Sequence, residues 1–132
     1  MARKIWSLVA LASAASIAGC GQGEVSFAND VKPLLDARCI GCHNPSGEGQ
    51  HASALNLADY ADIMKGTQFG PVVVPGSSIS SVLYMVVAGK TDPAIRMPPH
   101  HEESLAEGRG EPLSDAEIAM LARWIDQGAK NN

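Results

Sequence analysis

Two cysteines, two residues apart and followed directly by a histidine, form the most informative motif in this chain of 132 residues: Cys39-Ile40-Gly41-Cys42-His43. The motif places two thiols and an imidazole within five residues, which indicates a binding site for a metal or a cofactor. The sequence contains only one further cysteine, Cys20, and three cysteines are too few for a disulfide-stabilised scaffold. The motif therefore predicts a fold built around a group that sulfur and imidazole can bind.

The spacing of the motif is typical of covalent attachment of a c-type haem. Thioether bonds from Cys39 and Cys42 would fix one edge of the macrocycle, and the adjacent His43 would lie beneath the iron as an axial ligand. A thioredoxin-like redox pair would need a βαβ context that the sequence lacks, and a disulfide across two residues would be strained. A zinc site would need a fourth ligand, from among His51, His100 and His101. We therefore expect one covalent haem c.

The second axial ligand is a more open choice, because the candidates downstream of the motif are His51, Met64, Met85, Met97, His100, His101 and Met120. Met85 and Met120 lie in apolar helical runs, where methionine usually fills the core. Met97 differs, because it lies in Arg96-Met97-Pro98-Pro99, within a stretch from 92 to 112 that has little helical or strand signal. Long irregular segments of this kind are usually functional, and the prolines restrict the backbone next to Met97. We expect Met97, with His100 or His101 as the bis-histidine alternative.

The N-terminus reads as a targeting segment. Arg3 and Lys4 precede an apolar run, 5–17, that is too short to span a bilayer, as in a secretory signal peptide. The residues Ile17-Ala18-Gly19-Cys20 resemble the bacterial lipobox, which implies cleavage before Cys20 and acylation of that cysteine. The alternative is an ordinary signal peptide with a chance cysteine.

These boundaries divide the chain into a lipoprotein signal peptide (1–19), a lipidated tether (20–25) and one domain (26–130). The tether would reach at most ~18 Å, which would keep the domain close to the membrane. Gly21 rather than aspartate after Cys20 favours, by analogy with sorting rules, the outer membrane. Loss of Arg3 and Lys4 lowers the formal net charge from −4 to −6, and an acidic chain is not suited to binding nucleic acid.

The domain is predicted to be all-α with long irregular loops. Phe27, Val31, Leu34 and Leu35 recur at helical spacing after Ser26, and Pro33 implies that the regular helix starts late. The stretch 44–49 is rich in turn residues, and a short helix is expected over 58–65. The run 71–75 is rich in valine but too short to build a sheet.

Two further helices have clear boundary signals. Ser77 or Ser78 could cap a helix that runs through Val87, with Gly89 after it. Ser114 and Glu117 predict a capping box at the start of the last helix, which Gly128 would end. The apolar stripe of that helix consists of Ile118, Leu121, Ala122 and Ile125, flanked by Trp124.

The ordered motifs of residues 26–130 resemble the single-haem cytochrome c domains of the planctomycete type. The motifs are Phe27, Val31 and Pro33-Leu34-Leu35, then Cys39-Ile40-Gly41-Cys42-His43, Leu55-Asn56-Leu57, Gly70-Pro71-Val72-Val73-Val74-Pro75-Gly76-Ser77, Met97-Pro98-Pro99, Leu113-Ser114, Glu117-Ile118, Leu121, Trp124-Ile125 and Gly128-Ala129. The resemblance implies a cytochrome c-like fold of about four short helices around one covalent haem, with His43 and Met97 as axial ligands. It also implies that the first and last helices cross, with Phe27 packed against Trp124. The segment between Pro99 and Leu113 is longer and more charged than this pattern suggests. We expect its start, His100-His101-Glu102-Glu103, to be a solvated loop; the alternative is a surface feature specific to this protein.

An iron held by His43 and Met97 has no free position for a small-molecule substrate, so we expect an electron carrier and not an enzyme. Its partners would be redox proteins of the cell envelope with a basic docking face, and the membrane itself through the lipid on Cys20. The domain could also be the electron-transfer subunit of an oxidoreductase. The alternative is a haem enzyme or a gas or redox sensor in which Met97 is displaced. Aromatic residues make up only 5% of the chain, so haem would complete the core and the chain without it would be loosely folded.

Overall fold

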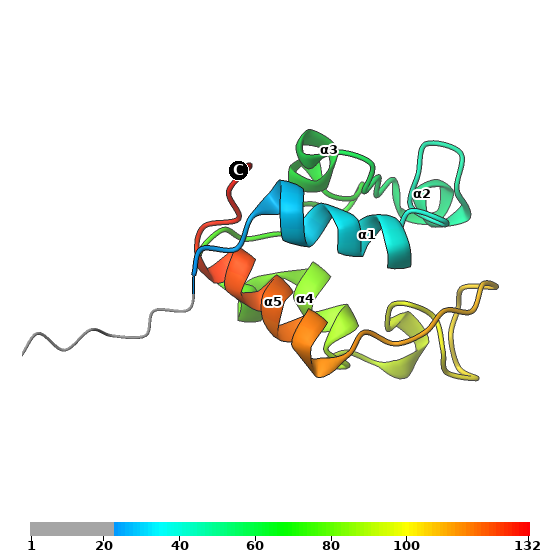
Figure 1. Ribbon diagram of the computed structural model, residues 1–132. Coiled ribbons are helices and arrows are strands. Elements are labelled where there is room, and N and C mark those ends of the chain that lie inside the picture. The colour runs from blue at the N-terminus through cyan, green and yellow to red at the C-terminus, as the bar shows by residue number, and fades with distance from the viewer. Residues whose placement is uncertain (1–22) are drawn as a thin grey trace, which may run out of the picture.

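Five short α-helices provide most of the regular structure in residues 23–132, the part of the chain that this computed structural model describes (Figure 1). They are α1 (Lys32–Arg38), α2 (Glu48–Ser53), α3 (Tyr60–Lys65), α4 (Val82–Val87) and α5 (Asp115–Asp126). Three shorter turns are η1 (Phe27–Val31, a π-helix), η2 (Ser78–Ser80) and η3 (Pro93–Ile95). Residues 23–132 contain no strand, only an isolated bridge between Thr67 and Gly70. The predicted all-α class with long loops is confirmed.

Local sequence signals place the first and last helices as expected. The Ser26 hydroxyl caps η1 by accepting a hydrogen bond from the amide of Asn29, and Pro33 falls in the first turn of α1, where no intrahelical donor is needed. At α5, Ser114 and Glu117 form the full capping box, and Gly128 follows the helix with a φ of +104°. The bonds from Ser114 hold the pKa of the Glu117 carboxyl below its ordinary value.

The first and last helical segments pack together through aromatic rings, as the resemblance implied. The ring centroids of Phe27 and Trp124 are 5.7 Å apart, and Tyr60 meets Phe27 edge-on at 5.2 Å. Around them lies a core of aliphatic side chains that includes Val31, Leu35, Leu57, Ile63, Leu121 and Ile125. This core lies beside the candidate site and holds α1 and α5 in place.

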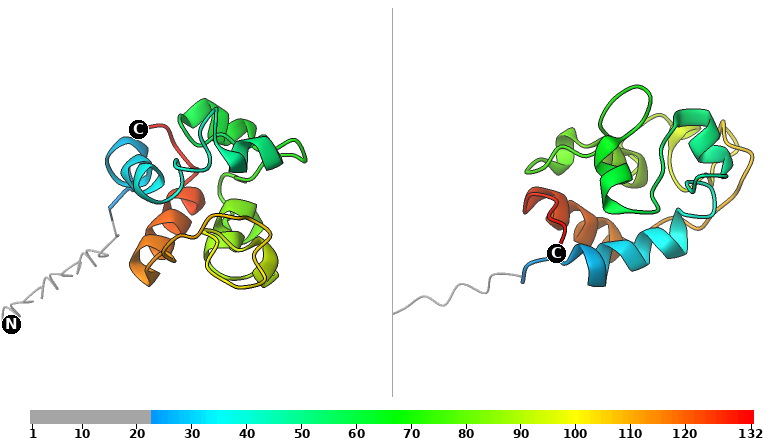
Figure 2. Two further views of the ribbon diagram at one scale, coloured as in Figure 1. Left: turned by 90° about the vertical axis from the view of Figure 1, so that its right-hand side faces the viewer. Right: turned by 90° about the horizontal axis from the view of Figure 1, so that it is seen from above.

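The C-terminal residues fasten the start of the described chain to the end of α5. The amide of Phe27 donates to the Asn132 side chain at 2.8 Å, and the amide of Ala28 donates to the Asn132 carbonyl at 2.9 Å. The amide of Val25 donates to the Gln127 side chain at 2.8 Å. We call these three bonds the terminal clasp. They hold residues 25–28 at the C-terminal end of α5, whereas the irregular segment after Met97 leads into its N-terminal end (Figures 1 and 2).

Three boundaries differ from the sequence prediction. The stretch 44–49 is rich in turn residues and no helix was expected between it and residue 58, but α2 begins at Glu48. The helix expected over 58–65 starts at Tyr60, because the Asp59 side chain caps it by accepting from the amide of Asp62. The helix expected from Ser77 or Ser78 is a separate η2 turn followed by α4, because the buried Ser81 hydroxyl bonds the carbonyl of Ser77 and the amide of Val74.

Among residues 23–132, no helix has the length and apolar character that crossing a membrane requires. The predicted lipidation site Cys20 and the predicted signal peptide lie outside the described residues.

Candidate functional site

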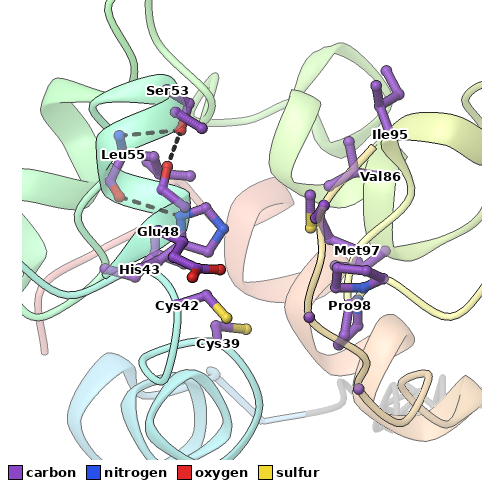
Figure 3. Close-up of a pocket in the computed structure, with 18 of the residues that line it drawn as sticks. Cys39, Cys42, His43, Glu48, Ser53, Leu55, Val86, Ile95, Met97 and Pro98 are labelled. Atoms are coloured by element: carbon purple, nitrogen blue, oxygen red, sulfur yellow. Dashed lines mark hydrogen bonds between the residues drawn. The ribbon is translucent and has the colours of Figure 1, made fainter. Parts of the chain in front are cut away.

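The Cys-X-X-Cys-His motif forms a tight turn at the end of α1. Cys39 caps α1 through a bond from its amide to the Leu35 carbonyl, and the amides of Cys42 and His43 both donate to the carbonyl of Cys39. Cys39 and Cys42 are not joined in a disulfide, and their sulfur atoms point toward the same space (Figure 3). Burial is the main reason that the pKa of the Cys39 thiol is raised to about 11. The turn thus presents two free thiols side by side, next to an imidazole.

Hydrogen bonding fixes the orientation of His43. Its Nδ1 lies 3.2 Å from the Leu55 carbonyl, and a carbonyl can only accept, so Nδ1 carries the proton and donates it. The other ring nitrogen, Nε2, then has a free lone pair on the side that faces away from Leu55 (Figure 3). Burial lowers the pKa of His43, although the bond to Leu55 opposes this effect, which favours the neutral ring that binds metals.

Helix α2 packs closely against the motif. A β-carbon at Gly49 would lie 2.6 Å from Cε1 of the His43 ring and 2.8 Å from both ring nitrogens. The amides of Gly49 and Gln50 donate to the Cys42 carbonyl, at 2.9 and 3.3 Å. Only glycine at position 49 allows α2 to pack this closely against the His43 ring, and this packing restricts the ring's movement. The sequence analysis missed this role, although the signal available was the glycine pair, Gly47 and Gly49, just after the motif.

Met97 lies on the wall opposite His43. Its backbone follows η3, and its amide donates to the Val86 carbonyl of α4 at 3.1 Å. Figure 3 shows the Met97 sulfur directed toward the space that the His43 ring faces from the other side. An imidazole and a thioether therefore approach one space from two elements that are distant in sequence.

That space is a cavity of about 620 Å³, within the range of roughly 300–1,000 Å³ that is usual for small-molecule and cofactor sites. Most of its lining is apolar, and the apolar residues include Leu55, Leu57, Val72, Val82, Leu83, Val86, Val87, Ile95, Pro98, Pro99 and Leu105. Cys39, Cys42, His43 and Met97 all line it. Two thiols, one imidazole and one thioether around a single apolar cavity are a donor set that fits a covalently held haem.

The other candidate ligands, all within the described part of the chain, do not line this cavity. Met64 and Met120 pack against the hydrophobic core. His100 bonds the Pro98 carbonyl through Nδ1, and Nε2 of His101 lies beside Arg96. Residues 23–132 also contain no group of three or more His, Cys, Asp or Glu side chains placed to hold a metal ion, so the zinc alternative gains no support.

The charged segment before α5 has two parts: residues 105–110 line the cavity, and Glu102 and Glu103 before them are exposed. Residues 105–110 line the cavity, and the segment is pinned by bonds from the Leu105 amide to Ala94 and from the Gly110 amide to Pro99, both 2.9 Å. The Arg109 guanidinium donates to carbonyls of its own turn, those of Ala106 and Gly108. Glu102 and Glu103, in contrast, are exposed as expected.

One family model matches the part of the chain that contains the motif and Met97. Residues 39–101, from the first motif cysteine through Met97 to His101, match the model of the family described as Planctomycete cytochrome C. No curated protein and no solved structure matched the chain significantly. Domains of this family carry covalently bound haem c, and the family supports a haem-based electron carrier rather than an enzyme. The motif, the all-α fold and the family match together show that this chain contains a planctomycete-type cytochrome c domain.

Proposed function

We propose that the domain holds one haem c and transfers single electrons, with thioether bonds to Cys39 and Cys42 and with His43 and Met97 as axial ligands. The observation that carries this proposal is the placement of His43 and Met97 on opposite walls of one apolar cavity into which both motif thiols point (Figure 3). When bound, the haem iron supplies the one-electron couple. Ligation by histidine and methionine raises the reduction potential relative to two histidines.

The chain's own residues perform three tasks in this function. The Leu55 carbonyl fixes the tautomer of His43, so that Nε2 is the nitrogen available to the iron. The bond from the Met97 amide to Val86 holds the thioether side of the cavity to α4. The apolar lining excludes water, and a low-dielectric site of this kind disfavours the more highly charged oxidised state.

We also propose that a lipid on Cys20 anchors the protein in the cell envelope, most simply in the outer membrane. Two features support this: the lipobox-like sequence, and the terminal clasp, which leaves only a few residues between Cys20 and the first anchored residue, Val25. The clasp lies at the C-terminal end of α5, and the segment that covers the cavity enters α5 at its other end (Figure 1). At 1.5 Å per residue the twelve residues of α5 span roughly 18 Å, so an anchored domain would point its cavity end away from the membrane.

The partners proposed for this domain are envelope redox proteins that bear a basic docking face. The support is the net charge, −4 for the whole chain and −6 without Arg3 and Lys4. Opposite charge accelerates encounter in a salt-dependent way.

The second candidate function is a haem enzyme or a gas sensor in which Met97 leaves the iron. One observation favours it: Met97 lies outside the helices, whereas the His43 ring is supported by α2. A segment with fewer supports opens more easily.

The test is an optical spectrum of the purified ferric protein, produced in a host that attaches c-type haem. A weak long-wavelength charge-transfer band marks a bond between methionine sulfur and ferric iron, and we expect the wild type to show it. Met97→Leu should abolish the band while keeping a similar volume. Met85→Leu is the matched control, because Met85 lies on α4 but does not line the cavity, and it should leave the band unchanged.

A high-spin spectrum of the wild type, or a spectrum typical of two histidines, would refute ligation by Met97. Carbon monoxide added to the reduced protein separates the two functions. An unchanged spectrum supports the electron carrier, and rapid formation of a carbonyl complex supports the enzyme or sensor.

A further inference from the structure

A polar contact lies beside Met97 in the chain. Arg96 donates from Nε to the carbonyl of Thr91 at 3.0 Å, and its Nη1 lies 3.3 Å from Nε2 of His101. Thr91 precedes η3 and His101 follows Met97, so the Arg96 guanidinium ties together the two segments that flank Met97. We call these three residues the Arg96 clamp.

The contact with His101 requires one protonation state. A guanidinium has donors and no acceptor, so Nε2 of His101 must accept and the ring must be neutral, with its proton on Nδ1. A protonated His101 would offer no lone pair to Arg96 and would place a second positive charge beside the guanidinium. The bond would then be replaced by repulsion.

Within residues 23–132, no neighbouring side chain takes the place of His101 as a partner of the Arg96 guanidinium. His101 also faces the ring of His100, at a centroid distance of 4.1 Å, and His100 is itself bonded to the Pro98 carbonyl. Glu102 and Glu103 follow on the same loop, are exposed, and take part in none of the ion pairs among the described residues.

The polar side chains on the neighbouring segments also make no bond to Arg96. The Asp92 carboxylate, before η3, accepts from the amide of Ala94 and is not bonded to Arg96. The hydroxyls of Thr91 and Ser104 are buried without a partner, so neither supports the guanidinium through its side chain.

We propose that Arg96 and neutral His101 are positioning residues for Met97, and that acid opens this clamp and loosens Met97. The inference rests on the proposed function, in which Met97 is an axial ligand. After protonation of His101, the segment keeps the Thr91 bond and the bond from the Met97 amide to Val86.

The experiment follows the charge-transfer band of the ferric, haem-loaded protein from pH 8 to pH 5. In the wild type the band should weaken at least about twofold, as the population with Met97 bound falls. His101→Gln keeps an acceptor that does not titrate, so its band should stay constant. His101→Lys carries a fixed positive charge and should have a weakened band at every pH.

His100→Gln is the matched control, because His100 is adjacent and titratable but does not contact Arg96. It should respond to pH as the wild type does. Hydrogen exchange of the Met97 amide gives a second readout that does not depend on the iron. Its protection factor, in which the rate is corrected for the pH dependence of intrinsic exchange, should fall at pH 5 in the wild type but not in His101→Gln.

The outcomes distinguish this inference from the function it rests on. Absence of the band at every pH in the wild type overturns ligation by Met97. A band that is present at pH 8 but fades equally in the wild type and in His101→Gln overturns the clamp and leaves ligation intact. If the pH response of the band disappears in His100→Gln, then His100 and not His101 causes it, and the clamp is overturned.

Discussion

The two walls of the cavity are built in different ways. The His43 wall consists of the motif turn, α2 and Leu55, within residues 39–57. They are joined by backbone bonds from Gly49 to Cys42 and from Leu57 to His43, and by the bond from the His43 ring to Leu55. The Met97 wall consists of irregular segments that a few bonds hold in place: Met97 is bonded to α4, Arg96 to His101, and the covering segment, residues 105–110, to η3. A wall in which a helix packs tightly against the His43 ring tolerates little change, whereas irregular segments held by a few bonds can move. This contrast fits a rigid histidine facing a methionine that the chain must hold in place.

We expect the largest difference in stability between the two walls in protein produced without haem. The apolar cavity would then be open to water, so we expect the haem-free chain to melt broadly and without cooperativity. The Met97 wall should loosen first, so the Met97 amide should exchange faster than the Leu57 amide, which is bonded to the His43 carbonyl. Calorimetry and hydrogen exchange would measure this. A sharp melt of the haem-free chain would contradict it.

The next test strains the His43 wall. Gly49→Ala places a β-carbon 2.6 Å from the His43 ring, and overpacking of this kind costs about 1–3 kcal/mol. We expect the free energy of unfolding in urea to fall by that amount and the spectrum to show a displaced His43. Gly41→Ala is the control, because it lies in the motif itself with no atom within 4 Å of the added carbon. Equal losses in both variants would show that the effect is not contact with the ring.

An added β-carbon on the Met97 wall should lower the free energy of unfolding by less. Gly110→Ala brings a β-carbon to 2.7 Å from Cβ of Pro98, but the covering segment can shift. We expect a loss of under about 1 kcal/mol in stability, together with a weaker charge-transfer band. Gly108→Ala meets only ordinary contact, 3.7 Å from the Cys42 sulfur, and serves as the control. A loss as large as that of Gly49→Ala would mean that the two walls are equally rigid.

The smallest effect concerns the point where the covering segment enters α5. Ser114→Ala removes an exposed cap and should cost about 0.5 kcal/mol, the lower end of the range for such caps. Because the bonds to Ser114 lower the pKa of Glu117 in the folded protein, their stabilisation is present above the unfolded value near 4.5 and is lost as pH falls below it. The difference in urea stability between wild type and variant should therefore shrink below pH 4.5. A difference that is constant down to pH 3 would exclude Glu117 as its source.

Sequence reasoning was most successful where a few neighbouring residues decide the outcome. The capping box at Ser114, the proline in the first turn of α1 and the glycine after α5 are local signals, and the structure confirms each of them. The start of α4 was misplaced because Ser77, Ser78 and Ser81 are all acceptable helix starts by sequence, and only the bonds of the Ser81 hydroxyl to Val74 and Ser77 separate η2 from α4.

Two features of the site depended on information that local patterns lack. Helix α2 has no apolar stripe and no buried side chain within its bounds, so periodicity gave no sign of it. The choice of Met97 over the histidines could not be made from spacing alone, because which side chains line the cavity depends on how α4 and the covering segment pack.

The terminal clasp has a mechanical consequence. A pull on the chain before Val25 would load the bonds to Gln127 and Asn132, which lie next to the buried Phe27 and Trp124 rings. Force would therefore pass into the end of α5 and the aromatic core. The turn that carries Cys39 and Cys42 follows the far end of α1, away from the clasp. A protein held by its N-terminal segment would thus take the load at the end of α1 opposite the motif cysteines.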